Sequence, residues 1–166
     1  MKQKYNNSRA KKKVKLISSH ITIFDAKDRL SLRCKFNFHY FNIQEAGQDF
    51  KDWTQPQLVE LLTKLKEFSE NSLKNWNAMK LGNSVGHILE VYTYFPPKDK
   101  TDFIEPRNIP IEAEWCRFRL DSDTRVIGFI IPEKHHDTFH KKSGFRFDKN
   151  TFYIVFLDAE HKFYIP

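Results

Sequence analysis

The sequence predicts an α+β fold, in which a mostly antiparallel sheet carries a helical hairpin on one face and is preceded by an N-terminal strand hairpin. Three observations support this prediction. Strand-like segments lie near the N-terminus, helical periodicity occupies the middle of the chain, and at least three strand-like segments follow in series. The chain has 166 residues, 40% of them hydrophobic and 16 of them phenylalanine, which is typical of one folded domain with its own core.

The positive charge of the chain is concentrated in its first 15 residues. The net charge is +7, and this segment holds seven basic residues and no acidic one. The other 21 basic residues equal the 21 acidic residues in number. We therefore predict a flexible basic tail at 1–15 and a single α+β domain at 16–166. Such a tail attracts phosphate groups without sequence preference, which makes Lys11, Lys12 and Lys13 candidate RNA contacts; the alternative is a solubilising terminus.

Composition also favours a cytoplasmic protein without a membrane partner. No segment has the length of an apolar membrane span, and the basic start is not followed by the apolar run of a signal peptide. The two cysteines, Cys34 and Cys116, are too few for a disulfide scaffold and are predicted to be free core thiols.

The first half of the domain is predicted to contain a strand hairpin and two helices. The hairpin joins His20–Phe24 to the alternating stretch Leu30–Tyr40. Thr54 is a candidate N-cap, with Pro56 in the first turn of a helix that carries leucines at helical spacing. Ser72 is expected to cap a second helix and Gly82 to end it.

The second half is predicted to be mainly strands. Residues 87–94 fit either a strand or a third helix, and the proline-containing segment 96–110 is expected to form a loop. Strands are expected at 114–120, 125–131 and 152–158, with a charged, histidine-bearing insertion at 133–150. The last strand is apolar on both faces, as in a strand buried inside a sheet.

One face of the predicted C-terminal strands is rich in polar and cationic side chains. Alternation places Trp115, Arg117 and Arg119 together, and neighbouring strands would add Arg125 and then His161 with Tyr164. Arginine binds phosphate in a bidentate manner, aromatic rings stack on bases, and histidine and tyrosine transfer protons without a metal. The alternative is a solvated face, on which Arg117 and Arg119 pair with Glu112, Glu114, Asp121 or Asp123 and His161 is a turn residue.

These segments resemble the C-terminal half of the RelE/YoeB-type mRNA interferase toxins, which place a Trp-x-Arg strand before an Arg-apolar-apolar strand and finish on a hydrophobic strand with a terminal His-Tyr or Tyr. The helix pair ahead of the sheet fits this resemblance. It implies that Arg125 is the transition-state arginine, that His161 and Tyr164 are acid/base and stacking residues, and that Glu112 or Glu114 is the strand carboxylate. The first 50 residues and the 133–150 insertion have no counterpart in those toxins.

The C-terminal run from Phe152 to Tyr164 also resembles the ending of uncharacterised proteins from bacterial mobile elements and defence islands. Together, the two resemblances imply a toxin-antitoxin or phage-defence protein that binds RNA or the ribosome and is neutralised by an antitoxin or another protein partner. We therefore expect a metal-independent endoribonuclease acting on ribosome-bound mRNA, or alternatively a non-catalytic accessory protein. The expected catalytic residues are Arg125, His161, Tyr164, Arg119 and Glu114, and the expected RNA contacts include Arg117, Trp115 and Lys162.

Two features of the 133–150 insertion suggest other chemistry. His136 and His140 are one helical turn apart and, with His135, would suit a metal, but no HExxH motif is present and an exposed loop is the favoured interpretation. Phe145-Arg146-Phe147 would suit stacking on single-stranded nucleic acid, although a hairpin with one buried face explains the same residues better. No cofactor is expected, since the chain has no glycine-rich phosphate loop.

Overall fold

A computed structural model describes residues 30–82 and 86–165 of the chain. Contacts divide the chain between Ser31 and Leu32, and the architecture below is that of the unit Leu32–Pro166. The predicted domain boundary at residue 15, the basic tail with Lys11, Lys12 and Lys13, and the predicted strand His20–Phe24 lie outside the described residues.

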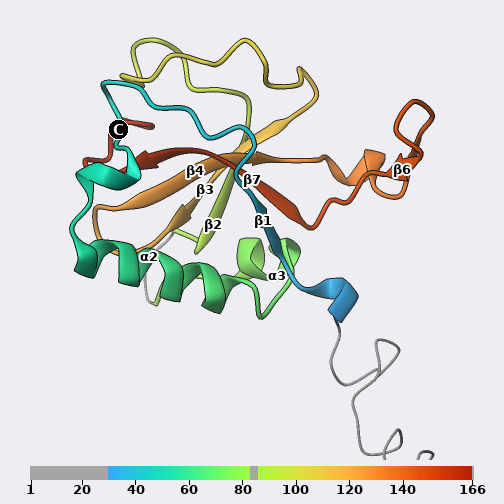
Figure 1. The fold of residues 1–166 in the computed structure, drawn as a ribbon, viewed down its shortest axis with the longest axis horizontal. Helices are drawn as coiled ribbons and strands as arrows, with labels where there is room; N and C mark the ends of the chain where they lie inside the picture. The colour runs from blue at the N-terminus through green and yellow to red at the C-terminus, as the bar shows by residue number, and fades with distance from the viewer. Residues whose placement is uncertain (1–29, 83–85, 166) are drawn as a thin grey trace, which may run out of the picture. The chain divides into compact units, whose positions relative to one another are not determined.

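The core of the fold is a five-stranded sheet in the order β1-β7-β4-β3-β2 (Figure 1). Its strands are β1 (Lys35–Asn37), β2 (Leu89–Thr93), β3 (Glu114–Arg119), β4 (Arg125–Ile130) and β7 (Thr151–Asp158). β1 is parallel to β7, and the other three pairings are antiparallel. The α+β prediction is confirmed, and the open choice at 87–94 is decided in favour of a strand.

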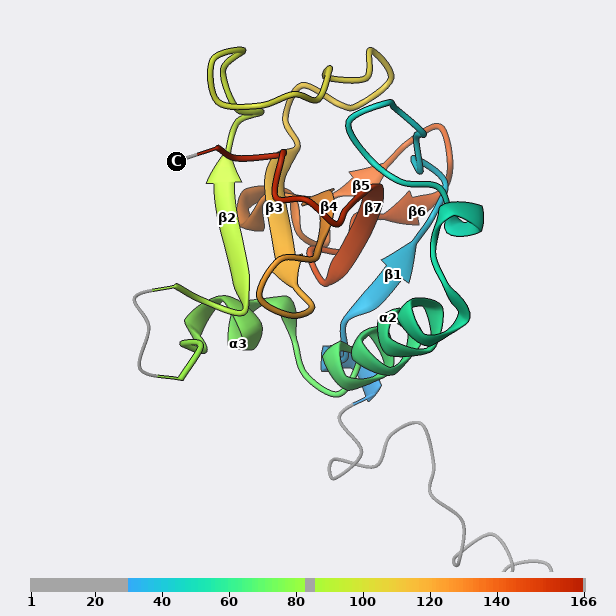
Figure 2. The ribbon, with the colours of Figure 1, turned by 90° about the vertical axis from the view of Figure 1, so that its left-hand side faces the viewer.

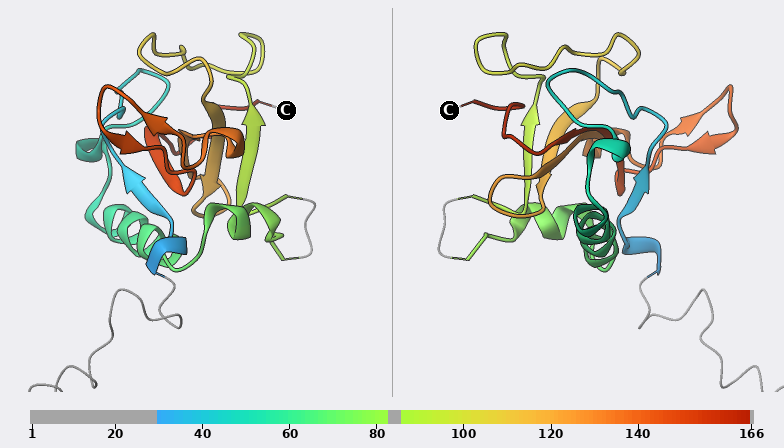
Figure 3. Two further views of the ribbon diagram at one scale, coloured as in Figure 1. Left: turned by 90° about the vertical axis from the view of Figure 1, so that its right-hand side faces the viewer. Right: turned by 60° about the vertical axis from the view of Figure 1, so that its left-hand side comes forward.

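A small hairpin and short helical turns complete the secondary structure of the described residues. The hairpin joins β5 (Phe139–His140) to β6 (Phe145–Arg146) and projects away from the main sheet (Figure 3). Three 3-10 turns lie at η1 (Leu30–Leu32), η2 (Phe50–Asp52) and η3 (Glu133–His135). The hairpin lies within the insertion predicted at 133–150.

Two helices, α2 (Gln55–Phe68) and α3 (Leu73–Ala78), begin where the sequence predicts. Thr54 is the N-cap of α2, and its backbone N–H donates to the Gln57 side chain at 2.8 Å. Ser72 caps α3 by accepting from the backbone N–H of Asn75 at 3.2 Å.

The predicted end of the second helix at Gly82 is wrong. α3 ends at Ala78, because Met79 already has extended backbone angles and the chain turns toward β2. Gly82 instead has a φ of +55° in the turn beyond Met79.

The helices cover one face of the sheet and form the first of two apolar clusters (Figure 1). The ring of Phe68 in α2 stacks on Phe118 of β3, with centroids 4.3 Å apart. Trp76 of α3 packs edge-on against Phe68 and donates its indole N–H to the Phe68 carbonyl at 2.7 Å. Both cysteines are free and buried in this cluster, as predicted.

The opposite face is covered by irregular chain rather than by helices (Figure 2). Its apolar cluster joins Trp115 of β3 and Phe156 of β7 to Phe103 of the segment after β2 and Phe163 beyond β7. Burial on both faces explains why β7 lacks the alternation of a half-exposed strand.

The long N-terminal strand predicted over Leu30–Tyr40 is largely wrong. Only β1 is extended within it, and it pairs with β7. The Asn37 side chain accepts from the backbone N–H of His39 at 2.9 Å, forming a turn that ends the strand. Beyond this turn, Tyr40 packs edge-on against Phe129 on the face opposite the helices, so the later aromatic residues of the stretch pack outside the sheet.

Gly128 in the middle of β4 is required by close packing. A Cβ there would lie 2.1 Å from the Tyr153 carbonyl oxygen and 2.6 Å from the Phe152 ring. We expect Gly128→Ala to lower the free energy of unfolding by about 3 kcal/mol, measured by urea denaturation. The matched control is Gly144→Ala, which meets no atom within 4 Å and should cost about 1 kcal/mol through its positive φ alone. Equal losses in the two variants would contradict this assignment.

Candidate functional site

The register of the sheet brings the predicted arginines together on the face opposite the helices. Arg119 lies opposite Arg125 in the β3–β4 pair, and Arg117 lies opposite Glu90 in the β2–β3 pair. Arg117 and Arg119 alternate with the fully buried Phe118, which points toward the helices. With His161, these residues form what we call the arginine cluster: Glu90, Arg117, Arg119, Arg125 and His161.

Glu90 of β2 joins two of the arginines. Its Oε2 lies 2.7 Å from Nη2 of Arg117, and its Oε1 lies 2.7 Å from Nη2 of Arg119. Burial opposes ionisation of this carboxyl, but the hydrogen bonds from Tyr92 and Arg119 and the charge of Arg117 outweigh burial and lower its pKa to about 2. Glu90 is therefore an anion that orients two guanidinium groups.

Two tyrosines form the side wall of the arginine cluster. The Tyr92 hydroxyl donates to Glu90 Oε2 at 2.6 Å, and the Arg117 guanidinium lies over the Tyr92 ring at 5.4 Å. Burial, followed by the bond to Glu90, raises the pKa of Tyr92. Tyr164 stacks on Tyr92 with ring centroids 5.1 Å apart and planes within 6°. The predicted residue Tyr164 therefore packs on Tyr92, and Tyr92 contacts Arg117.

His161 contacts Arg117 directly. Its Nε2 lies 3.0 Å from Nη1 of Arg117, and because a guanidinium only donates, Nε2 must be the unprotonated acceptor. Burial and the charges of Arg117 and Arg125 lower the pKa of His161 below its usual 6.5. The structure thus holds a neutral imidazole beside three cations, with a basic nitrogen directed at one of them.

Asp158 organises the turn that carries His161. This fully buried carboxylate accepts backbone N–H bonds from Glu160, Lys162 and Phe163 at 3.2, 3.0 and 2.9 Å. The turn includes a left-handed backbone at His161, with φ of 58°. Such a conformation is uncommon for a non-glycine residue, and the Asp158 bonds together with the buried ring of Phe163 hold it in place.

The position of Arg125 does not match the role of transition-state arginine that the resemblance implies. Its side chain is only 1% exposed, and it donates to the carbonyls of Asp121, Ser122 and Thr124 at 2.8–3.0 Å. Burial and the charges of Arg119 and Arg117 lower its pKa. Arg125 therefore closes the β3–β4 turn and adds positive potential, without a surface for a ligand to touch.

Other predicted residues lie away from the centre of the cluster. Trp115 is 2% exposed and donates to Glu105, so it packs in the core and offers no face to a base. Glu114 begins β3 at the opposite end from Arg119, and its charge acts on Cys116 of the helix-side cluster. Lys162 forms an ion pair with Glu160. The carboxylate that joins the arginines is Glu90, not Glu112 or Glu114.

The residues that sequence reasoning missed are Glu90 and Tyr92. Residues two apart on a strand share a face, so Glu90 and Tyr92 would have been predicted together if 87–94 had been assigned as a strand.

The histidines of the insertion make contacts other than with one another. His140 Nδ1 lies 2.8 Å from the Ser143 hydroxyl, and His136 Nδ1 accepts from the backbone N–H of Lys149. Over 30–82 and 86–165, no three His, Cys, Asp or Glu side chains are grouped as metal ligands would be. In the β5–β6 hairpin, Phe139 and Phe145 are 50% and 76% exposed.

Compared with known proteins, the chain matches no family model, no curated protein and no solved structure. None of the helices in the part of the chain that the structure describes is long and apolar enough to cross a membrane.

Proposed function

We propose that this chain binds single-stranded RNA at the arginine cluster and cleaves it without a metal, as a RelE/YoeB-type interferase would. The observation that carries the proposal is the contact of a neutral His161 Nε2 with Arg117 on a sheet face that gathers three arginines. Arg119 is the most accessible of them, since 22% of its side chain is exposed. Its guanidinium is the expected first contact for a phosphate.

The chemistry is transfer of the phosphoryl group to the neighbouring 2′-oxygen. A phosphate that takes the Arg117 N–H would release His161 Nε2, which then accepts the proton of the 2′-hydroxyl. The 2′-oxygen bonds to phosphorus, the bond to the 5′-oxygen breaks, and the Tyr164 hydroxyl protonates that leaving oxygen. Arg117 and Arg119, held by Glu90, stabilise the charge on the phosphoryl oxygens. The products are a 2′,3′-cyclic phosphate and a 5′-hydroxyl.

The segments that carry the resemblance to the RelE/YoeB toxins are adjacent strands. β3 with Trp115 and Arg117, β4 beginning at Arg125, and β7 leading to His161 pair side by side, with the helix pair on their other face. This arrangement supports a RelE-like fold. By the same resemblance, the proposed target is ribosome-bound mRNA and the proposed partner is an antitoxin or another defence-system protein that covers the arginine face.

A second candidate function is non-catalytic binding of nucleic acid or a protein within a mobile-element or phage-defence system. The observation in its favour is that Glu90 already neutralises part of the charge of Arg117 and Arg119, while Arg125 is buried. An ion pair of this kind stabilises a sheet face without reacting.

Expression of the chain in bacteria distinguishes the two proposed functions. We expect the wild type to arrest growth with cleavage of mRNA, and His161→Gln and Arg119→Gln to relieve the arrest at equal protein levels. The matched controls are His39→Gln and Arg107→Gln, which change exposed residues of the same types and should still arrest growth. Arg125 is unsuitable for this test, because its removal would release the β3–β4 turn. Intact mRNA and unaffected growth in the wild type would contradict cleavage and leave the binding function.

A further inference from the structure

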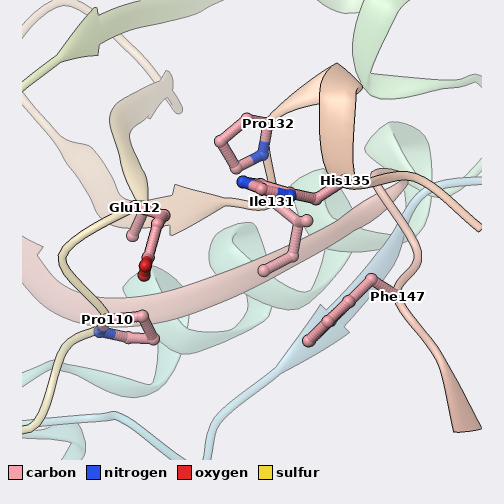
Figure 4. A pocket seen from close by; sticks show the side chains of 7 residues that line it. Pro110, Glu112, Ile131, Pro132, His135 and Phe147 are labelled. Carbon is pink, nitrogen blue, oxygen red and sulfur yellow. The ribbon is translucent and has the colours of Figure 1, made fainter. Parts of the chain in front are cut away.

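A second feature lies at the far end of the β3–β4 pair. A hollow of about 260 Å³ opens between the segment that precedes β3 and the segment that follows β4. Figure 4 shows Glu112 and Pro110 on one side of it, Phe147 on the other, and the His135 ring beside Pro132. Most of its wall is apolar, and it is lined by Ile131, Ala113 and the rings of Pro110, Pro132 and Phe147.

His135 lines this hollow and carries an unsatisfied polar atom. Its Nε2 is buried, and no hydrogen-bond partner is present among the described residues. A buried polar atom without a partner destabilises the fold, so such atoms in native proteins call for an explanation. The backbone of His135 is fixed by a bond from its N–H to the Pro132 carbonyl at 2.9 Å, and Pro132 lines the same hollow.

Glu112 supplies the complementary group. It is exposed, lines the same hollow, and makes no ion pair or hydrogen bond through its carboxylate within the described part of the chain. The hollow therefore offers flat apolar walls, one anionic acceptor and one imidazole nitrogen. A ligand that fits is planar, has adjacent N–H donors for the carboxylate, and has an acceptor for the imidazole.

We propose that this hollow binds a guanine base of single-stranded RNA. Guanine presents two adjacent donors, N1–H and the 2-amino group, and a carboxylate accepts both. Its O6 and N7 are acceptors for an N–H at His135 Nε2. Adenine and cytosine place a ring nitrogen acceptor beside their amino group, and uracil places carbonyls on both sides of its N–H, so each would set a lone pair against Glu112. Proline and phenylalanine rings are suitable surfaces for stacking.

The hollow lies where one RNA strand would reach both it and the arginine cluster. Ala113, in its wall, belongs to the apolar cluster on the face that carries the arginine cluster. β4 separates the two sites, and at about 3.4 Å per residue its six residues span roughly 17 Å, a distance that a few nucleotides cross. As a subsite for RNA, the guanine pocket rests on the proposed function and would select the sequence near the cleaved bond.

Saturation-transfer NMR with the four free nucleosides tests the pocket. We expect the full chain to bind guanosine at least about tenfold more tightly than adenosine, cytidine or uridine, the discrimination typical of a good bidentate contact. Glu112→Gln should lose at least about tenfold in guanosine affinity, and His135→Ala should weaken it as well. Glu60→Gln and His39→Gln, which change exposed residues of the same types, should leave it unchanged. Equal binding of all four nucleosides, no binding, or a Glu112→Gln variant that keeps the preference would overturn the proposal.

Free nucleosides also separate failure of the pocket from failure of the proposed function. They carry no phosphate, so Arg119→Gln should weaken binding of an RNA oligonucleotide but leave guanosine binding intact. RNA bound at the arginine cluster without guanosine selectivity would refute the pocket alone. Selective guanosine binding by a chain that binds no RNA would refute the proposed function and uphold the pocket.

Discussion

Replacement of Glu90 by glutamine is expected to lower the free energy of unfolding by about 3 kcal/mol at pH 7. Only 16% of the Glu90 side chain is exposed, and its two oxygens bind Arg117, Arg119 and Tyr92. The variant would leave two guanidinium groups, 7% and 22% exposed, without their shared anion. The measurement is urea denaturation. Glu67→Gln, which removes an exposed carboxylate paired with Lys64, is the matched control and should cost less than about 1 kcal/mol.

The same substitution should change how stability depends on pH. The pKa of Glu90 is lowered from 4.5 to about 2 in the folded protein. Its contribution is therefore complete above the unfolded value near 4.5 and is lost as the pH falls toward 2, because protonation then favours the unfolded chain. We expect wild type and variant to differ most above pH 5 and to converge as the pH approaches 2. Parallel curves over this range would show that Glu90 does not ionise as its contacts require.

Replacement of His161 by glutamine is expected to lower the rate of RNA cleavage by at least about 100-fold, the range for loss of a general base. Glutamine keeps an oxygen that can accept from Arg117 but cannot take up a proton at neutral pH. The readout is single-turnover cleavage of a labelled oligonucleotide, with His39→Gln as the control. A variant with the wild-type rate would exclude His161 as the base.

The pH profile distinguishes a catalytic role of His161 from a structural one. Its pKa lies below 6.5, so the imidazole is neutral and able to accept a proton at pH 7. The wild-type rate should stay level from pH 8 to below 6.5 and decline only when His161 becomes protonated. His161→Gln should lack this decline. A wild-type rate that rises as the pH falls below 6.5 would be inconsistent with a neutral histidine base.

The arginine face was predictable because strands have a period of two. Alternation in β3 separates Arg117 and Arg119 from Cys116 and Phe118, and a short turn places Arg125 on the neighbouring strand. Capping residues likewise predicted the starts of both helices, since the Ser72 side chain accepts from a backbone N–H of its helix and the Gln57 side chain accepts from the backbone N–H of Thr54. These features depend on neighbours in sequence.

The predictions that were wrong concern features that depend on contacts between distant segments. Nothing local to Arg125 shows that it would be buried against three turn carbonyls. Trp115 was expected on a polar face, but Phe103 and Phe163, from segments on either side of it in the sequence, cover that end of the face and bury it. The stretch Leu30–Tyr40 alternates like a strand, although most of it packs as irregular chain.

The most direct test of metal-independent cleavage is product analysis with purified protein, single-stranded RNA and excess EDTA. We predict fragments that end in a 2′,3′-cyclic phosphate and begin with a 5′-hydroxyl, with no cleavage of an oligonucleotide that carries a 2′-deoxy residue at the cleaved position. Cleavage of the 2′-deoxy substrate, or cleavage that EDTA abolishes, would contradict attack by the 2′-hydroxyl at the arginine cluster.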